Sequence, residues 1–171
     1  KSVILTPGNY GEDFLRNHSF LAVFPIVKCS NYIGDALDFS IAYGFRKILL
    51  IGHIGKFIKL AGGIMNTHSH YADCRMELFA AHAAYAGAEQ NTIIQLMNAI
   101  STDACIEILD KAGLRKDVLS SLLRNIQFHI TERVKGNAEI GAVLFSNVHG
   151  FLGQTETVSK LIARLQRREN P

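Results

Sequence analysis

The stretch that decides the fold class is Lys47-Ile48-Leu49-Leu50-Ile51, which Gly52-His53-Ile54-Gly55 follows directly. The first five residues are apolar on both alternating faces, and short strands of this kind are typical of the interior of parallel sheets. The glycines that follow predict a tight turn, and a helix is expected to begin near Lys56. This strand, turn and helix together indicate an α/β domain.

Short apolar runs alternate with helical patterns along the rest of the chain. Ser30 or Asn31 caps a helix that ends at Gly44, and several helices follow one another between Arg75 and Val134. Such alternation predicts βαβ units. We therefore expect residues 1–171 to form a single α/β domain, with a mostly parallel sheet, helices on both faces and a helical insertion before the last strand. The expected strands are Val3–Thr6, Ile26–Lys28, Lys47–Ile51 and Ala142–Phe145.

The composition excludes several broad classes of protein. Hydrophobic residues make up 48% of the chain, charged residues 19%, and the formal net charge is +3, which is not the composition of a disordered chain. The sequence contains no basic stripe with interleaved aromatic residues, so we expect no nucleic-acid partner. No apolar run is long enough to span a bilayer, so we expect no membrane partner.

The cysteines and the start of the chain carry information about its context. Cys29, Cys74 and Cys105 are odd in number, and no pair has C-x-x-C spacing. This usage is typical of reduced thiols in a cytoplasmic protein and argues against a disulfide framework or a zinc site. Because the sequence opens without Met on an expected strand, we expect it to be a fragment or one domain of a longer chain.

The segment from Gly52 to Asp73 is the richest in residues that could carry chemistry. Ligands of open parallel sheets bind beyond the carboxyl ends of strands, and the first N–H groups of a following helix favour an anion. Lys56 and Lys59 are three residues apart and share a helix face, where two ammonium groups could hold carboxylates. The alternative is that both lysines are solvated and the glycines only permit close packing.

The run Thr67-His68-Ser69-His70-Tyr71-Ala72-Asp73 is unusually polar and admits three interpretations. His68, His70 and Asp73 could bind a transition metal, although paired metal ligands on helices usually stand four residues apart. They could instead bond a polar ligand, with one imidazole as proton acceptor near neutral pH. In the third interpretation, the imidazoles and hydroxyls only satisfy the backbone of a turn.

Two further turns join expected strands to expected helices, namely Gly8-Asn9-Tyr10-Gly11 and the run from Ser30 to Gly34. Neither these nor Gly52–Lys56 match the spacing of a phosphate loop or of a dinucleotide fingerprint. We expect all three turns to converge at one sheet edge, with Thr67–Ser69 nearby.

The run Gly52-His53-Ile54-Gly55-Lys56-Phe57-Ile58-Lys59-Leu60-Ala61-Gly62-Gly63-Ile64-Met65-Asn66-Thr67-His68-Ser69 resembles the signature of the cobalt-precorrin-5B C1-methyltransferases of anaerobic cobalamin biosynthesis. The resemblance covers most of the chain from Lys1 to about Ala88, and the remainder only in general pattern. It implies that the chain is the C-terminal half of a longer enzyme. The further matching runs are Thr6–Gly11, Ser30–Gly34, Ala72-Asp73, Met76-Glu77 and Ala80–Ala83.

The resemblance implies methyl transfer from S-adenosylmethionine to C-1 of a cobalt-containing tetrapyrrole. The alternative is a non-catalytic tetrapyrrole-binding domain that needs the N-terminal half for activity. Catalytic roles fall to His68, as base or hydrogen-bond donor, and to Asp73, as its orienter or as an acceptor for the donor's ribose. No resident metal is expected, and a homo-oligomer is left open. The expected substrate-binding residues are Lys56, Lys59, Asn66, Thr67 and Ser69, and the expected cofactor-binding residues are Gly8, Asn9, Gly11, Ser30, Asn31, Gly52, His53 and Gly55.

Overall fold

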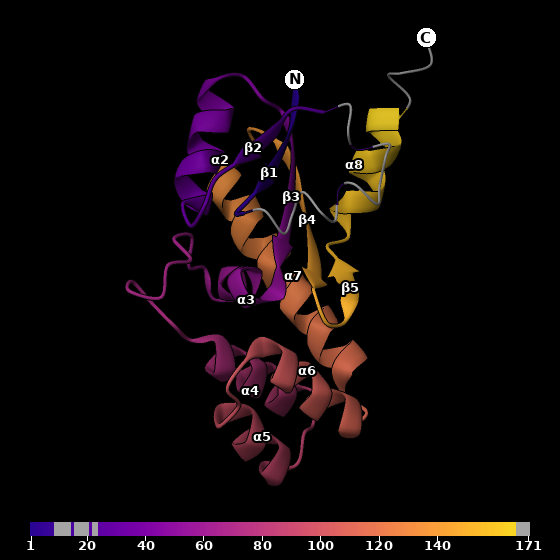
Figure 1. Cartoon of the computed structure of the whole chain (residues 1–171). Helices are drawn as coiled ribbons and strands as arrows, with labels where there is room; N and C mark the ends of the chain where they lie inside the picture. The colour runs from indigo at the N-terminus through magenta and orange to yellow at the C-terminus, as the bar shows by residue number, and fades with distance from the viewer. Residues whose placement is uncertain (9–14, 16–20, 22–23, 167–171) are drawn as a thin grey trace.

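The computed structural model describes residues 1–8, 15, 21 and 24–166 (Figure 1). Within this part of the chain, a five-stranded sheet has the order β2-β1-β3-β4-β5. Strands β1 to β4 are parallel, and β5 runs antiparallel to β4. The predicted α/β fold with a mostly parallel sheet is confirmed. The strands are β1 (Ser2–Thr6), β2 (Ile26–Lys28), β3 (Lys47–His53), β4 (Glu139–Ser146) and β5 (Gly150–Gln154).

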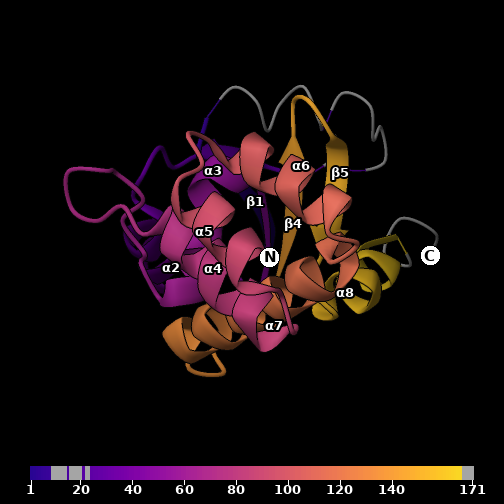
Figure 2. The ribbon, with the colours of Figure 1, turned by 90° about the horizontal axis from the view of Figure 1, so that it is seen from below.

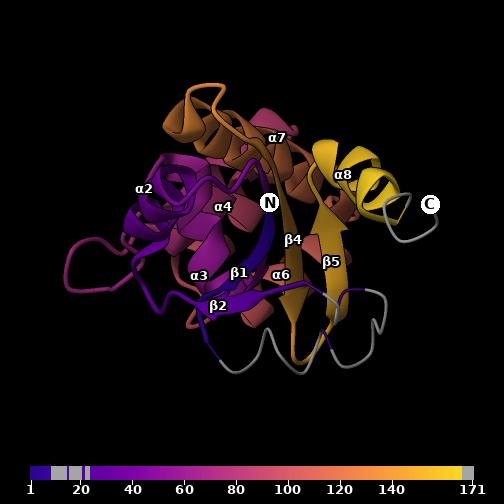
Figure 3. The same ribbon diagram turned by 90° about the horizontal axis from the view of Figure 1, so that it is seen from above.

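Strand β3 occupies the centre of the sheet and is buried on both faces. Ile48 and Leu50 join a large core with residues of α2 (Ile33–Ala42) and of the long helix α7 (Arg115–Val134). Leu49 and Ile51 join a smaller core on the other face, with residues of α8 (Thr157–Gln166). The view from above shows α2 and α8 on opposite sides of the strands (Figure 3). The predicted coverage of both faces by helices is confirmed.

The helical insertion lies between β3 and β4. It contains α4 (Arg75–Tyr85), α5 (Gln90–Met97), α6 (Thr102–Lys111) and α7, and the first three form a lobe below the sheet (Figures 1 and 2). Helix α7 connects this lobe to the sheet, because it packs against α4 and α6 as well as β4. Its buried stripe follows the period predicted for a long helix and comprises Val118, Leu122, Ile126, Ile130 and Val134.

The predicted turn after the central strand is wrong by two residues. Gly52 and His53 continue β3 and pair with Leu144 and Phe145 of β4. Helix α3 (Ile54–Phe57) therefore begins at Ile54 instead of Lys56, and a 3-10 helix η2 (Ile58–Gly62) follows it. The glycine serves packing, because a Cβ at position 52 would lie 2.4 Å from the ring of Phe57.

The sequence analysis misses strand β5. Glycines weaken strand propensity, and both Gly150 and Gly153 have a positive φ, of 67° and 152°. The strand forms because the tight connection after β4 folds the chain back onto it, with Val143 opposite Gln154. The helical insertion thus precedes the last parallel strand, and β5 is added at the edge of the sheet.

We predict that Gly52→Ala lowers the free energy of unfolding, because its methyl group would overlap the Phe57 ring. Overpacking of this kind typically costs about 1–3 kcal/mol. The matched control is Gly8→Ala, since no atom of the described residues lies within 4 Å of the position that a Cβ would take there. Urea denaturation of both variants measures the difference, and equal stabilities would contradict this packing explanation.

Candidate active-site cavity

A cavity of about 800 Å³ lies at the carboxyl edge of the parallel strands. Its walls come from the ends of β1, β3 and β4, from α3, and from the N-terminal ends of α4 and α6. We call it the carboxyl-edge cavity. This volume is typical of a small-molecule site, and the location is the one at which α/β sheets bind ligands. It is lined by Thr6, Pro7, Gly8, Gly52, His53, Gly55, Lys56, Arg75, Ser101, Thr102, Asp103, Asn147 and Val148.

His53 ends β3 and caps α3 at the floor of the cavity. Its Nδ1 accepts a hydrogen bond from the Gly55 N–H at 3.0 Å, so the ring proton of the neutral form sits on Nε2. Burial lowers the pKa of His53, and the negative charge of Asp103 opposes that shift. The imidazole is therefore neutral at physiological pH and presents an N–H donor, with its acceptor nitrogen already used.

Among the described residues that line the cavity, Asp103 is the one carboxylate. It lies in the first turn of α6, and its Oδ1 accepts a 2.5 Å hydrogen bond from the Ser146 hydroxyl. Ser146 Oγ in turn accepts from the N–H groups of Val148 and His149. This chain of bonds fixes the carboxylate between the helical lobe and the end of β4.

Two cationic side chains from the described part of the chain line the cavity, those of Lys56 and Arg75. The Lys56 ammonium donates to the Pro7 carbonyl at 3.1 Å. Burial is the main cause that lowers the pKa of Lys56, with the charge of Lys59 adding to it. The Arg75 guanidinium binds both oxygens of Asp73 at 2.7 Å, and these hydrogen bonds hold the pKa of Asp73 below its usual range. Asp73 is thus committed to positioning Arg75.

Lys59 has a structural environment that the sequence spacing did not indicate. Its side chain is only 2% exposed, and the ammonium donates to the carbonyls of Thr67 at 3.1 Å and Ala72 at 2.8 Å. Lys59 therefore ties down the loop between η2 and α4, and it does not share an exposed face with Lys56. Its predicted substrate-binding role stays a prediction.

The loop of residues 64–74 projects from the domain beside α3 (Figures 1 and 2). His68 and Ser69 are exposed on it, and neither lines the cavity. The Asn66 side chain accepts from the His68 N–H at 3.1 Å, and His68 Nδ1 accepts from the His70 N–H at 3.0 Å. These bonds agree with the third interpretation of the run, in which its side chains satisfy the backbone of a turn. The catalytic role of His68 stays a prediction.

The turn after β2 stands at the same edge of the sheet, next to the cavity. The Cys29 N–H donates to the Thr6 carbonyl at 2.9 Å. Asn31 accepts from Thr67 twice, through its carbonyl at 2.9 Å and through its side-chain oxygen at 3.2 Å. Asn31 therefore binds the projecting loop, and neither it nor Ser30, which has a φ of 53°, lines the cavity. Of the remaining predicted residues, Asn9 and Gly11 lie outside the described part of the chain.

The sequence analysis did not single out several residues that line the cavity, although the sequence held a signal for some of them. Asn147 and Val148 follow the end of a predicted strand, to which the rule of carboxyl ends applies equally. Ser101 precedes a helical pattern and caps it by accepting from the Ala104 N–H at 3.1 Å. The sequence held no signal that this helix start would face the sheet.

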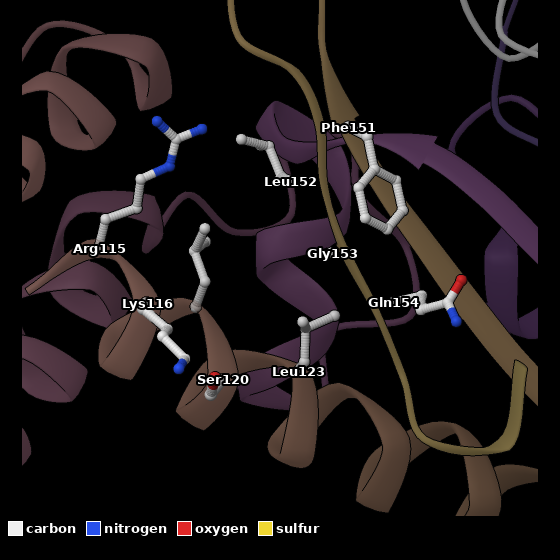
Figure 4. A pocket seen from close by; sticks show the side chains of 9 residues that line it. Arg115, Lys116, Ser120, Leu123, Phe151, Leu152, Gly153 and Gln154 are labelled. Atoms are coloured by element: carbon white, nitrogen blue, oxygen red, sulfur yellow. The ribbon is translucent and has the colours of Figure 1, made fainter. Parts of the chain in front are cut away.

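A second hollow, of about 650 Å³, lies between α7 and β5 (Figure 4). It contains none of the residues predicted for the site. Arg115 and Lys116 stand on its α7 side, and Arg115 is paired with Asp110 at 2.9 Å. We therefore place the candidate site in the carboxyl-edge cavity.

Among the described residues, no group of three or more His, Cys, Asp or Glu residues is placed to hold a metal ion. No helix there has the length and apolar character that crossing a membrane requires.

The fold and the cavity define an α/β protein with a candidate small-molecule site at the carboxyl edge of a parallel sheet. Residues 66–156 match the family described as CbiD, C-terminal domain. The chain belongs to this family, in agreement with the resemblance found in the sequence.

Curated relatives support the same assignment. A cobalt-precorrin-5B C(1)-methyltransferase of Ruminiclostridium cellulolyticum is 45% identical over 85% of the chain and 38% of the relative. The enzyme of the same name from Alkaliphilus metalliredigens is 36% identical over 97% of the chain and 44% of the relative. The chain thus spans less than half the length of these two relatives. No solved structure matches it significantly.

We predict that Lys59→Met destabilises the protein, because it leaves the Thr67 and Ala72 carbonyls without their donor. Each buried polar group left unsatisfied costs about 1–3 kcal/mol. Lys56→Met is the control, since that lysine makes one bond and is half-buried. Urea denaturation and proteolysis of the loop measure the effect. Equal loss in both variants would contradict a special role of Lys59 in holding the loop.

We predict that His53 makes stability fall as the pH drops below the usual histidine pKa. Burial depresses the pKa in the folded protein, so the unfolded chain takes up the proton first, and stability is lost from about pH 6.5 downward. His53→Asn keeps a capping acceptor and cannot titrate. Thermal melts between pH 7.5 and 5.5 should show a shallower pH dependence for this variant than for the wild type. Identical slopes would show that His53 is not linked to folding.

Proposed function

We propose that this chain is the C-terminal part of an S-adenosylmethionine-dependent enzyme that methylates C-1 of cobalt-precorrin-5B in cobalamin biosynthesis. The observation that carries the proposal is the carboxyl-edge cavity, which gathers Lys56, Arg75 and Asp103. The relatives bear the name of this activity, and the chain belongs to their family. Because the chain spans less than half of their length, the proposed activity also requires residues elsewhere in the longer protein.

The residues of the cavity fit the chemistry of the methyl donor. Asp103 offers a carboxylate acceptor of the kind that binds ribose hydroxyls, and the cations can hold the donor's carboxylate. Gly8 also lines the cavity, and among the described residues no atom lies within 4 Å of the position that a Cβ would take there. In this proposal Asp103 takes the ribose-binding role that the sequence analysis considered for Asp73.

In this proposal, the substrate binds at the rim of the carboxyl-edge cavity. Cobalt-precorrin-5B is a macrocycle larger than a drug-sized ligand, so it cannot enter the cavity whole. The loop with Asn66, His68 and Ser69 projects next to the cavity, and the Asp73–Arg75 pair joins it to the cavity wall. We propose that these residues contact the macrocycle, and that Lys56 holds one of its peripheral carboxylates or that of the methyl donor.

Bound S-adenosylmethionine would supply an electrophilic methyl group for attack by a ring carbon. The contribution of this chain is alignment, which can provide a large part of the acceleration in such a transfer. Asp103 is held rigidly through Ser146, and His53 lines the same cavity close enough to feel the charge of Asp103. His68 remains our candidate for a hydrogen-bond donor at the substrate, because it is exposed and its Nδ1 accepts from the His70 N–H, which leaves the ring proton of the neutral form on Nε2.

The alternative is a tetrapyrrole-binding domain whose catalysis requires the remainder of the longer protein. Calorimetric titration with S-adenosylhomocysteine separates the two possibilities. Binding by this chain supports a donor site in the carboxyl-edge cavity. Absence of binding here, together with binding by the full-length relative of Ruminiclostridium cellulolyticum, favours the alternative.

We predict that Asp103→Asn weakens S-adenosylhomocysteine binding by about 10- to 100-fold, because a hydrogen bond to a charged group is worth about 1.5–3 kcal/mol. The loss should be much smaller for the 2′,3′-dideoxy analogue, which lacks the hydroxyls that the carboxylate would accept from. Titration of both ligands with both proteins gives the coupling directly.

Asp117→Asn is the matched control, since Asp117 also lies in the first turn of a helix but does not line the cavity. It should leave both affinities unchanged. If Asp103→Asn weakens the two ligands equally, the carboxylate does not bind the ribose, although the donor site itself would stand.

A further inference from the structure

An apolar groove runs along the side of the domain where β2 forms the edge of the sheet. It has a volume of about 670 Å³ and lies between β2, β1 and α2. Val3 and Leu5 of β1 form its floor, and Phe39 and Tyr43 of α2 stand on its rim. We call it the β2–α2 groove.

The aromatic residues on the rim of the groove are largely exposed to solvent. Phe39 is 64% exposed, Tyr43 is 73% exposed and Tyr32 is 54% exposed. Apolar patches of this kind on soluble proteins mark sites of interaction. Because the side chains that line the groove come from both a helix and strands, they would contact a partner from two sides.

Strand β2 adds a backbone component to the same surface. Its three residues, Ile26–Lys28, are all exposed, and it pairs with β1 on one side only among the described strands. An edge strand of this kind can accept a further strand from a partner, and proteins usually cover or block such edges. Leu15 and Leu21, from the connection between β1 and β2, pack in the α8 core on the opposite face of the sheet. They therefore do not fill the groove.

The comparisons indicate what covers the groove. The chain matches a family described as a C-terminal domain and spans 38% and 44% of two longer relatives. In those relatives the preceding polypeptide joins the domain at the start of β1, where the Lys1 carbonyl accepts from the Arg46 and Lys47 N–H groups. Val3, two residues further on, already lines the groove. The preceding part thus enters next to the groove.

We propose that the β2–α2 groove is the docking surface for the N-terminal part of the longer polypeptide, which packs on Phe39 and Tyr43 and covers the edge of β2. The groove ends at Cys29 and Tyr32, and the Cys29 N–H is bonded to the Thr6 carbonyl at the wall of the carboxyl-edge cavity. The docked part therefore reaches the rim of the candidate site, where it can supply further contacts to the substrate. This proposal rests on family membership and stands whether or not the methyl donor binds in the cavity.

The test uses the full-length relative of Ruminiclostridium cellulolyticum, whose alignment covers 85% of this chain. A photoreactive benzoylphenylalanine replaces the residue at the position aligned with Phe39. The control carries it at the position aligned with Tyr85, an 80% exposed aromatic residue of α4 outside the groove. After irradiation, mass spectrometry maps the crosslinked peptides.

The expected result is an intramolecular crosslink from the first position to a peptide N-terminal to the matched region, and none of this kind from the control. A crosslinked species of doubled mass would assign the groove to a second copy and overturn the proposal. Failure of both positions to crosslink would show that the groove faces solvent, and it would overturn the proposal as well. Neither result depends on ligand binding.

Discussion

The two-sided burial of β3 is the constraint on which the rest of the structure depends. Ile48 and Leu50 need helices on one face of the sheet, and Leu49 and Ile51 need cover on the other. A strand with no face in water takes a central, parallel position, so its carboxyl end opens at the same edge as its neighbours. The Phe57 ring then packs on Gly52 and turns the chain sharply away from that edge. The cavity occupies the space so created.

Sequence periodicity predicted the elements whose burial is set locally. The alternation in β3 and the stripe from Val118 to Val134 depend only on neighbours along the chain, and both were predicted. Strand β5 was missed because its pairing with β4, and not its glycine-rich sequence, makes it a strand. The position of the cavity at the carboxyl edge of the sheet could be predicted from the topology. That Arg75 and Asp103 would line the cavity could not be predicted, because their positions depend on how the helical lobe packs against the sheet.

The two lysines show why spacing alone could not assign the site. Lys56 and Lys59 are three residues apart, yet α3 gives way to η2 between them, and only Lys56 reaches the cavity. Burying an ammonium group is costly unless its donors are bonded. The carbonyls of Thr67 and Ala72 satisfy this need, so the projecting loop and Lys59 stabilise one another. The cation that complements Lys56 is Arg75, which the loop holds through Asp73.

The helical insertion is therefore part of the site and not only cover for the sheet. It places Arg75 and Asp103 opposite Lys56, and the bond from Ser146 to Asp103 joins the lobe to the end of β4. Ser146 holds the Asp103 carboxylate and Asp73 holds the Arg75 guanidinium, so each of these two charged groups is fixed by a partner of its own. The projecting loop is joined to the cavity wall through the Asp73–Arg75 pair, and the turn after β2 is joined to it through the bond from the Cys29 N–H to the Thr6 carbonyl. In our proposals, the macrocycle and the preceding part of the polypeptide approach from these two sides.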